Sequence, residues 1–381
     1  MAKYNILSLF DGISGGRIAL ERAFIDVDKY YASEVDKYAI EVTNRNYPDT
    51  IQLGDITKIS YKEGILYTEN GDFNVGTIDI LLGGSPCQSF TFAGKREGMK
   101  TESKIDILTL KDYLNYKKKG FKFSGQSYLF WEYMRLLKEI NPKYFLLENV
   151  KMESKWKDVI SEAIGIEPIN INSNLLSAQN RDRLYWTNIN NGKIPLPKDK
   201  GLKLKDILIK SMDDKYPLSK THYDAFMKSY PNWKHCPIDG KAKPLLATYY
   251  KQPPHCPYIK SKKSESGYRR LSPLECERLQ TLPENYTLGL SDTQRYKTIG
   301  NGWTVDVISY ILSFINNYKS YEILKEEFED SFSFENLKEL QDIIKTLLEE
   351  NELDINIYDE KVNYKDLRYK ILDNLLNREK F

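Results

Sequence analysis

The chain contains little cysteine and no long apolar run. Its four cysteines show no paired framework, which argues against a disulfide-stapled protein and fits a reducing compartment. The longest apolar stretch near the carboxyl end, residues 305–315, is interrupted by Asp306 and two serines and is too short to span a bilayer. The first nine residues lack the zones of a signal peptide. We therefore expect a cytoplasmic protein with no membrane partner.

The composition is that of a globular protein, with 41% hydrophobic and 29% charged residues. A length of 381 residues allows two or three domains. The net charge of +2 hides an asymmetry: residues 187–268 hold 16 lysines against seven acids, whereas residues 317–381 hold ten basic residues against 17 acids. The basic segment suits a polyanionic partner such as nucleic acid, or is a solvated lysine face. The acidic tail is not expected to touch phosphates.

A single cysteine follows a short apolar run. Residues 78–82 are typical of a buried strand and lead into Gly83-Gly84-Ser85-Pro86-Cys87-Gln88. Ligands of open α/β sheets bind at the carboxyl ends of strands, and a proline fixes the backbone beside the thiol. Cys87 is therefore a candidate nucleophile, with a small buried apolar residue as the alternative.

Three consecutive strand patterns end in polar groups. The strand pattern at 4–10 leads into a glycine turn at 11–16, a second strand ends in Glu34, and Asp55 follows a third. Doubly wound folds place a carboxylate for ribose hydroxyls near the position of Glu34, although the glycine spacing is not the full dinucleotide fingerprint. The alternating strands and helices predict a parallel α/β domain that binds an adenosine-like cofactor with a charged amino acid end.

A long basic segment separates Cys87 from a helical pattern at 128–140. A short helix is expected within 105–116. Loops of this length are unusual unless they act as lids or are disordered, so we interpret the segment as a lid over a phosphate-bearing substrate, with a disordered insertion as the alternative. Its basic residues are Lys95, Arg96, Lys100, Lys104, Lys111, Lys117, Lys118 and Lys119.

Ionisable side chains mark the next two strand patterns. Glu148 interrupts the apolar run 144–150, where an ionised carboxylate needs a partner or takes up a proton. Arg181 and Arg183 stand two residues apart, so on a strand they would point to one face and could hold a base oxygen and a phosphate. Surface ion pairs are the alternative interpretation of the arginines.

From residue 188 the composition turns to proline, lysine and tyrosine, which indicates a second, smaller domain. Two His-Cys pairs within it, at 235–236 and 255–256, lack the Cys-x-x-Cys spacing of common zinc sites, so no metal site is predicted. Ser272 and Pro273 predict a capped helix start. A glycine turn around 300–302 opens an apolar helix that should pack back onto the first domain.

Taken together, these segments resemble the DNA cytosine-C5 methyltransferases in order over residues 4 to about 315. Each segment alone is a weak signal, but eight in order leave little room for chance. Family members usually have Thr where Ser272 stands. The matching segments are Leu9-Phe10-Asp11-Gly12 with Gly15, Ser33-Glu34-Val35, Gly54-Asp55-Ile56, Gly83 to Gln88, Leu147-Glu148-Asn149-Val150, Gln179-x-Arg181-x-Arg183, Arg270-x-Ser272-Pro273-x-Glu275, and Gly300-Asn301 with Val305.

The resemblance implies a chemistry for these residues. The Cys87 thiolate would add to cytosine C6 while Glu148 stabilises a proton on N3, and C5 would then take the methyl group of S-adenosylmethionine. Arg181 and Arg183 would hold the base O2 and adjoining groups. The base must leave its stack to be reached, which implies base flipping in double-stranded DNA. The cofactor-binding residues carried over are Phe10, Asp11, Gly12, Ile13, Ser14, Gly15, Glu34, Val35, Asp55, Ile56, Thr57, Asn301, Gly302 and Trp303.

The expected architecture is α/β, a Rossmann-like S-adenosylmethionine-dependent methyltransferase domain with a smaller target-recognition domain and a helical tail. The catalytic domain would span 1–187 and the recognition domain 188–290; residues 291–318 would complete the catalytic domain and 319–381 would form the helical extension. A cognate restriction endonuclease is a further partner that the resemblance allows.

Two other functions are open at this point. One is a tRNA cytosine-C5 methyltransferase of the same fold, a branch that carries Pro-Pro-Cys where this chain has Ser-Pro-Cys. The other is a catalytically silent DNA-binding homologue, against which the presence of Cys87, Glu148 and both motif arginines argues.

Overall fold

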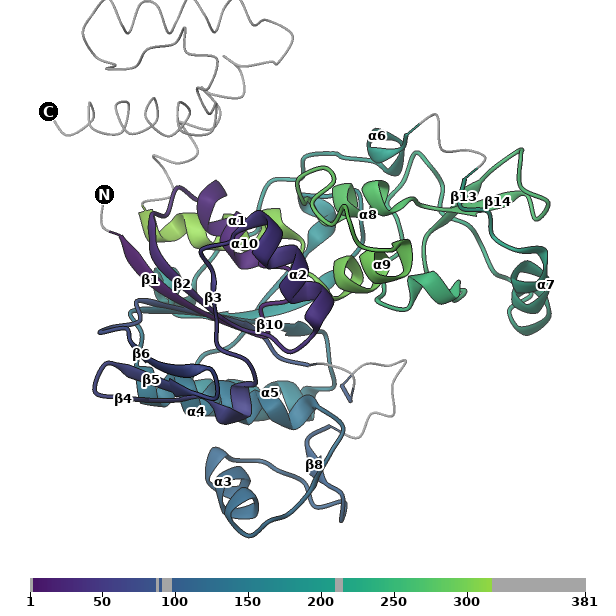
Figure 1. Cartoon of the computed structure of the whole chain (residues 1–381). Coiled ribbons are helices and arrows are strands. Elements are labelled where there is room, and N and C mark those ends of the chain that lie inside the picture. Colours follow the sequence, from purple (N-terminus) through teal and green to yellow (C-terminus); the bar gives the residue numbers. More distant parts are fainter. Residues whose placement is uncertain (1–2, 87–88, 91–97, 210–214, 317–381) are drawn as a thin grey trace, which may run out of the picture. The chain divides into compact units, whose positions relative to one another are not determined.

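The computed structural model describes residues 3–86, 89–90, 98–209 and 215–316. The chain divides into two compact units, Met1–Leu312 and Ser313–Phe381, and nearly all described residues belong to the first (Figure 1). Cys87 and the predicted helical tail lie outside the described ranges.

A seven-stranded sheet forms the centre of the first unit. Its strands lie in the order β11-β12-β10-β7-β1-β2-β3. The neighbours from β10 to β3 pair in parallel, whereas β12 runs antiparallel to both β10 and β11. The strands are β1 (Tyr4–Leu9), β2 (Val27–Ser33), β3 (Ile51–Gln52), β7 (Ile80–Gly84), β10 (Tyr144–Val150), β11 (Ile169–Asn172) and β12 (Asp182–Thr187).

The sequence pattern predicts a parallel α/β domain, and the antiparallel strand β12 departs from that pattern. Only residues 173–181, with the 3₁₀ turn η3 (Ser173–Leu175), connect β11 to β12. A parallel neighbour needs a crossover of a dozen or more residues, so this short connection allows only an antiparallel return. The turn brings residue 183 opposite Val150 on β10.

Helices cover both faces of the sheet (Figure 1). Helices α1, α2 and α10 lie on one face, and α4 and α5 lie on the other. Side chains alternate along β7 accordingly: Leu81 belongs to the apolar core that contains Trp131 and Ile160, whereas the Leu82 side chain lies near Gly16 on α1. The helices are α1 (Gly15–Arg22), α2 (Lys37–Asn46), α4 (Phe130–Ile140), α5 (Ser154–Ile164) and α10 (Val305–Ser313).

Two insertions in the chain lie on the face of the sheet that α4 covers, one between β3 and β7 and the other between β7 and α4 (Figure 1). The first is an antiparallel sheet of β4 (Ser60–Lys62), β5 (Ile65–Thr68) and β6 (Gly71–Asn74). The second holds the pair β8 (Lys100–Thr101) and β9 (Phe123–Ser124) around helix α3 (Leu110–Lys118). A short helix is therefore present, but it spans Leu110–Lys118 and so both begins and ends later than the predicted 105–116. A 3₁₀ turn, η2 (Ser127–Leu129), joins β9 to α4.

The described residues between 188 and 270 contain little regular structure. The described part of this region has two short helices and a two-stranded ladder, and aromatic contacts hold it together: Trp233 packs edge-on against both Tyr258 and Tyr268. Its elements are η4 (Ile189–Gly192), α6 (Leu204–Ile207), α7 (Lys220–Ser229), η6 (Tyr249–Lys251), β13 (Tyr258–Lys260) and β14 (Tyr268–Arg270).

The chain then returns to the sheet through α8 (Pro273–Leu279) and α9 (Asp292–Asn301). The Ser272 side chain caps α8 together with Glu275 in a capping box, which confirms the predicted helix start. A turn at 302–304 separates α9 from α10, and the Val305 amide donates to the carbonyl of Gln280. A Cβ atom placed on Gly15 would lie 3.7 Å from Val305, so the apolar helix does pack on the first domain. The 3₁₀ turn η7 (Phe314–Asn316) ends the described chain.

Candidate active site

The turn after β1 holds three residues in the left-handed conformation. Phe10, Gly12 and Ser14 have φ angles of 56°, 59° and 56°. Glycine adopts this conformation readily, but for other L residues it is uncommon and carries strain. Such strain concentrates at ligand sites. The turn lies at the carboxyl end of β1, where the sequence places the cofactor.

Asp11 is the buried acid of this turn. Its carboxylate accepts hydrogen bonds from Ser14 Oγ at 2.5 Å and from the Tyr30 hydroxyl at 2.7 Å. Ser14 Oγ also lies 3.0 Å from Thr43 Oγ1 on α2. Burial raises the pKa of Asp11 to about 6, although the hydrogen bond from Ser14 opposes the rise. Asp11 therefore fixes the turn against β2 and, through Ser14, against α2.

Glu34 closes the neighbouring strand and faces the same turn. Its carboxylate accepts a hydrogen bond from the main-chain amide of Gly12 at 2.8 Å, and two more from the amides of Val35 and Asp36 at 2.7 and 2.8 Å. An ionised carboxylate has about four acceptor positions, so it can still accept from a ligand hydroxyl. The next side chain, Val35, is 71% exposed. An exposed apolar side chain beside a held carboxylate suits an aromatic ring attached to a ribose.

Asp55 extends this edge by one strand. Its side chain accepts the Thr57 amide at 2.9 Å and so caps the 3₁₀ turn η1 (Ile56–Lys58). Ile56 is buried in the apolar core, and Ser33 Oγ donates to the carbonyl of Gly54 at 2.8 Å. Since β2 and β3 are neighbours in the sheet, Glu34 and Asp55 follow adjacent strand ends.

Trp303 lies against the end of β7. A Cβ atom placed on Gly84 would lie 2.7 Å from Trp303 Nε1 and 3.3 Å from Glu148 Oε2, and one on Gly16 would lie 3.3 Å from the same indole. Any larger residue at 84 would displace the indole, so the glycine allows the close approach. The indole is thus between the start of α1 and the end of β7, beside Glu148.

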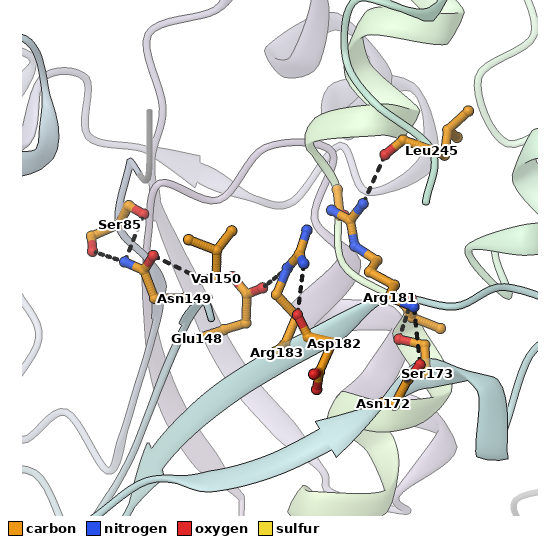
Figure 2. A network of polar contacts seen from close by, with 12 residues as sticks. Ser85, Glu148, Asn149, Val150, Asn172, Ser173, Arg181, Asp182, Arg183 and Leu245 are labelled. Carbon is orange, nitrogen blue, oxygen red and sulfur yellow. Dashed lines mark hydrogen bonds and ion pairs between the residues drawn. The ribbon is translucent and has the colours of Figure 1, made fainter. Parts of the chain in front are cut away.

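Glu148 and Arg183 form an ion pair at this strand end (Figure 2). Arg183 Nε lies 2.9 Å from Glu148 Oε1, and the two side chains are 15% and 12% exposed. The guanidinium also donates through Nη1 to the carbonyl of Asp182 at 2.8 Å. The antiparallel pairing of β10 with β12 supplies the geometry, because it places Glu148 opposite Tyr185, two residues from Arg183. The sequence leaves open a partner or a proton for this carboxylate, and the structure gives it a partner, Arg183.

Asn149 braces the segment that leads to the cysteine. Its buried side chain amide donates to Ser85 Oγ at 3.0 Å and to the carbonyl of Ser85 at 3.3 Å (Figure 2). On the far side of the cysteine, the Ser89 amide donates to Ser127 Oγ at 3.2 Å. The predicted nucleophile itself, Cys87, falls outside the described residues, whereas Ser85 and Ser89 on either side are fixed.

Arg181, the first arginine of the motif, is directed elsewhere. It precedes β12 and is 6% exposed. Its guanidinium donates to the carbonyl of Leu245 at 2.9 Å and to those of Gly300 and Gly302 at 3.3 and 3.0 Å (Figure 2 shows the first of these bonds). The structure therefore separates the two motif arginines: Arg183 meets Glu148, and Arg181 meets main-chain carbonyls.

The structure gathers most predicted cofactor residues at the carboxyl ends of β1, β2 and β3. Ile13 lies near Gly302, since a Cβ on that glycine would be 3.7 Å from Ile13 Cδ1. Two residues were not predicted: Tyr30, which holds Asp11, and Gln280, which donates to the carbonyl of Gly302 at 2.9 Å. Tyr30 carries no local signal, because an aromatic residue in a strand reads as core.

The two His-Cys pairs do not form a metal centre among the described residues, where no group of three or more potential metal ligands is found. Cys236 and Cys256 are buried, and burial raises the pKa of the Cys256 thiol to about 12. The His235 ring instead packs on Tyr268. Across the described ranges, no helix is both long and apolar enough to cross a membrane.

A mixed seven-stranded sheet with a glycine turn after β1 and acids after β2 and β3 defines an α/β protein of the S-adenosylmethionine-dependent methyltransferase fold. Two solved structures share it. A Dnmt2 methyltransferase from Schizosaccharomyces pombe aligns with a TM-score of 0.60 at 16% identity, covering 84% of this chain and 99% of that one. A DNA modification methyltransferase from an Escherichia coli prophage aligns with a TM-score of 0.54 at 18% identity, covering 83% and 99%.

Sequence comparison gives the family. A family model described as C-5 cytosine-specific DNA methylase matches residues 4–112 and 114–317, so the chain belongs to that family and is a DNA cytosine-5 methyltransferase. The type II methyltransferase M1.ScrFI of Lactococcus lactis is 30% identical over an alignment of 342 residues that covers 81% of this chain and 77% of the relative. M.HpaII of Haemophilus parainfluenzae is 28% identical over 80% and 87%, and the orphan methyltransferase M.SPBetaI of Bacillus phage SPbeta is 31% identical over 58% and 55%.

Proposed function

We propose that this methyltransferase acts on cytosine in double-stranded DNA through a covalent bond between Cys87 and C6 of a flipped base. The single observation that carries the proposal is the Glu148–Arg183 ion pair beside Gly84, at the strand end that leads to Cys87. An acid that can share a proton and a cation that can hold an oxygen are the two groups that a cytosine N3 and O2 require.

S-adenosylmethionine fits the edge formed by β1, β2 and β3. The exposed Val35 side chain offers an apolar surface for adenine, Glu34 retains acceptor capacity for ribose hydroxyls, and Asp55 follows the next strand. Trp303 lies against Gly84 at the end of β7 and against Gly16 at the start of α1. When bound, the cofactor supplies an electrophilic methyl group. The residues that would hold it are Phe10, Asp11, Gly12, Ile13, Ser14, Gly15, Glu34, Val35, Asp55, Ile56, Thr57, Asn301, Gly302 and Trp303.

The protein's own groups divide the chemistry into balanced steps. The Cys87 thiolate forms a bond to C6, and the electron pair of the C5–C6 double bond moves toward C5 while Glu148 stabilises the proton on N3. C5 would then form its bond to the methyl group as the bond between that methyl group and the cofactor sulfur breaks; the sulfur would keep the electron pair, and S-adenosylhomocysteine would be left. Loss of the C5 proton to a base returns the electron pair to the ring, and the C6–S bond breaks to release the thiolate. Arg183 holds the base O2 and keeps Glu148 oriented throughout.

The lysine-rich region from 187 to 268 supports DNA as the partner. Phosphate contacts from its lysines would supply salt-dependent affinity, while a few side chains read base edges. Extrusion of the base from the duplex costs a few kcal/mol, which these contacts offset. We place the activity in the cytoplasm and propose a restriction endonuclease with the same recognition sequence as a cellular partner, since M1.ScrFI and M.HpaII are named type II methyltransferases.

A cysteine substitution tests the mechanism. Cys87→Ser should abolish methyl transfer to duplex DNA and leave S-adenosylmethionine binding largely intact, because the thiol enters the reaction and not the cofactor contacts. Cys236→Ser, which changes a buried thiol of the recognition region, serves as the matched control and should retain activity. Full activity of Cys87→Ser would refute the covalent mechanism.

Substrate choice is tested separately. Labelled cofactor offered with duplex DNA or with tRNA should label only the DNA, and a duplex carrying 5-fluorocytosine should trap a covalent adduct. Labelling of tRNA alone would replace the proposed substrate, and no adduct would favour the silent DNA-binding homologue. Bisulfite sequencing of DNA from cells that express the protein would then give the recognition sequence.

A further inference from the structure

Arg181 occupies a junction between two distant segments of the chain. Its Nη1 donates to Leu245, which belongs to the lysine-rich recognition region, and its Nη2 donates to the carbonyls of Gly300 and Gly302. These two carbonyls flank Asn301, and Gly302 immediately precedes Trp303. One buried guanidinium thus contacts both the recognition region and the loop that we assign to the cofactor.

The two segments also touch directly at this point. A Cβ atom placed on Gly300 would lie 2.5 Å from the main-chain nitrogen of Ala247 and from the main-chain carbon of Leu246. Main-chain atoms cannot move aside as the end of a flexible side chain can, so a glycine is required there. The carbonyls of Gly300 and Gly302 lie at the carboxyl end of α9, where the helix dipole favours a cation.

Two buried glutamines complete the junction. Gln179 accepts the Leu245 amide at 2.7 Å and donates to Gln280 Oε1 at 3.0 Å. Gln280 donates in turn to the carbonyl of Gly302 at 2.9 Å, and its Oε1 accepts the Thr304 hydroxyl at 2.9 Å. The main chain around Leu245 and around Gly302 is therefore joined twice, once by Arg181 and once by the pair of glutamines.

We propose that Arg181 is a positioning residue that couples the recognition region to the cofactor loop, and that it does not contact the base. It holds the carbonyls that precede Trp303, so the indole stays against Gly84, and it holds the Leu245 segment in the same hydrogen-bonded unit. A ligand that orders one segment then lowers the cost of ordering the other. The inference deepens the proposed function and rests on it.

The test compares Arg181→Lys with Arg183→Lys. Lysine keeps the charge, but its single ammonium group cannot span three carbonyls as the guanidinium fork does. We expect Arg181→Lys to weaken S-adenosylhomocysteine binding by the DNA-free enzyme at least about tenfold. The reason is that the charged guanidinium's hydrogen bonds to the carbonyls of Gly300 and Gly302, which hold the loop, are lost. We expect Arg183→Lys to leave this affinity near the wild-type value and to lower kcat instead. Isothermal titration and steady-state kinetics give both quantities.

A second measurement isolates the coupling. Titration of S-adenosylhomocysteine with and without saturating duplex DNA gives the factor by which each ligand tightens the other, and this factor should fall toward one in Arg181→Lys. Gly300→Ala, which leaves Arg181 in place but forces the two main-chain segments apart, should lose the same coupling. It also covers the case in which Arg181→Lys fails to fold.

Each alternative result has a definite meaning. Wild-type cofactor affinity and coupling in Arg181→Lys, with a reduced kcat, would overturn the positioning role and favour a base contact for Arg181. Wild-type coupling in Gly300→Ala would overturn the junction. Failure of the wild-type protein to bind S-adenosylhomocysteine would instead refute the proposed function itself.

Discussion

At the scale of single residues, the site depends on charged groups that are largely shielded from water and are paired with specific partners. Glu148 is paired with Arg183, and Asp11 is satisfied by two hydroxyl donors. Asp11 is buried, and its side-chain partners among the described residues are hydroxyl groups. Its burial therefore raises its pKa, and its ionised form weighs against the folded state at neutral pH.

The first prediction concerns the pH dependence of stability at Asp11. A folded-state pKa of about 6 against 3.8 in the unfolded chain means that the folded protein binds the extra proton between these values. Stability contributed by this site therefore rises as pH falls through 6 toward 4, by on the order of 3 kcal/mol. Asp11→Asn removes this dependence. In denaturant unfolding, the free energy of unfolding of the variant relative to that of the wild type should increase from pH 4 to pH 7. A difference that stays constant with pH would contradict the raised pKa of Asp11.

The second prediction concerns Glu148. Glu148→Gln keeps the shape of the side chain but cannot share a proton with the base, so kcat should fall by roughly 10² to 10⁴. Glu139→Gln is the matched control, because it breaks another Arg–Glu ion pair, to Arg135 at 2.7 Å, on α4. The control should keep wild-type turnover. Equal losses in the two variants would mean that Glu148 acts only in folding.

At the scale of elements, the insertion between β7 and α4 is an ordered unit in its described part, residues 98–125. Glu132 of α4 is fully buried and pairs with Lys117 of α3, and it also bonds the Tyr113 hydroxyl and Arg135. These contacts attach α3 firmly to α4. The lid that the sequence predicts thus has, over its second half, an anchored helix that presents lysines to solvent.

The third prediction is that exposed lysines at the end of α3 contact DNA phosphates. Lys118→Ser with Lys119→Ser should weaken duplex binding, and the slope of log K against log salt should decrease by roughly two if both lysines contact phosphates. The control is Lys29→Ser with Lys143→Ser, which removes the same amount of charge. These two lysines lie near the amino ends of β2 and β10, at the edge of the sheet opposite to the carboxyl ends that carry the candidate site. Fluorescence anisotropy at several salt concentrations measures both, and identical slopes would exclude α3 from the interface.

At the scale of the whole molecule, the family match and the compact first unit end within a few residues of each other, at 317 and Leu312. The remaining segment carries 17 acidic residues and apolar stripes at helical spacing in its sequence. It lies outside the described residues, and the helical extension stays a prediction, as do the boundaries of the four predicted domains.

The fourth prediction is that removal of residues 320–381 lowers the melting temperature or the solubility more than it lowers turnover. The apolar surface that the tail covers, on this chain or on a partner, would become exposed, while every residue assigned to the site is retained. Thermal unfolding and methyl transfer by the same preparation measure the two effects. An unchanged melting temperature and solubility would contradict the prediction.

The sequence by itself determined the family, the strand ends that carry the site and the capped start of α8. Strand alternation, glycine turns and helix caps depend on residues only a few positions apart, so they can be read locally. The candidate site residues of the glycine turn, Glu34, Asp55 and Glu148 were predicted in this way because each lies at or directly after the end of an apolar strand.

Only the tertiary structure decided which side chains meet. Glu148 and Arg183 are 35 positions apart and become partners because β12 returns antiparallel to β10. Arg181 and Arg183 look equivalent in the sequence, yet the chain fold gives one a carboxylate and the other three main-chain carbonyls. Such pairings depend on strand register and on packing across distant segments, and no local pattern carries that information.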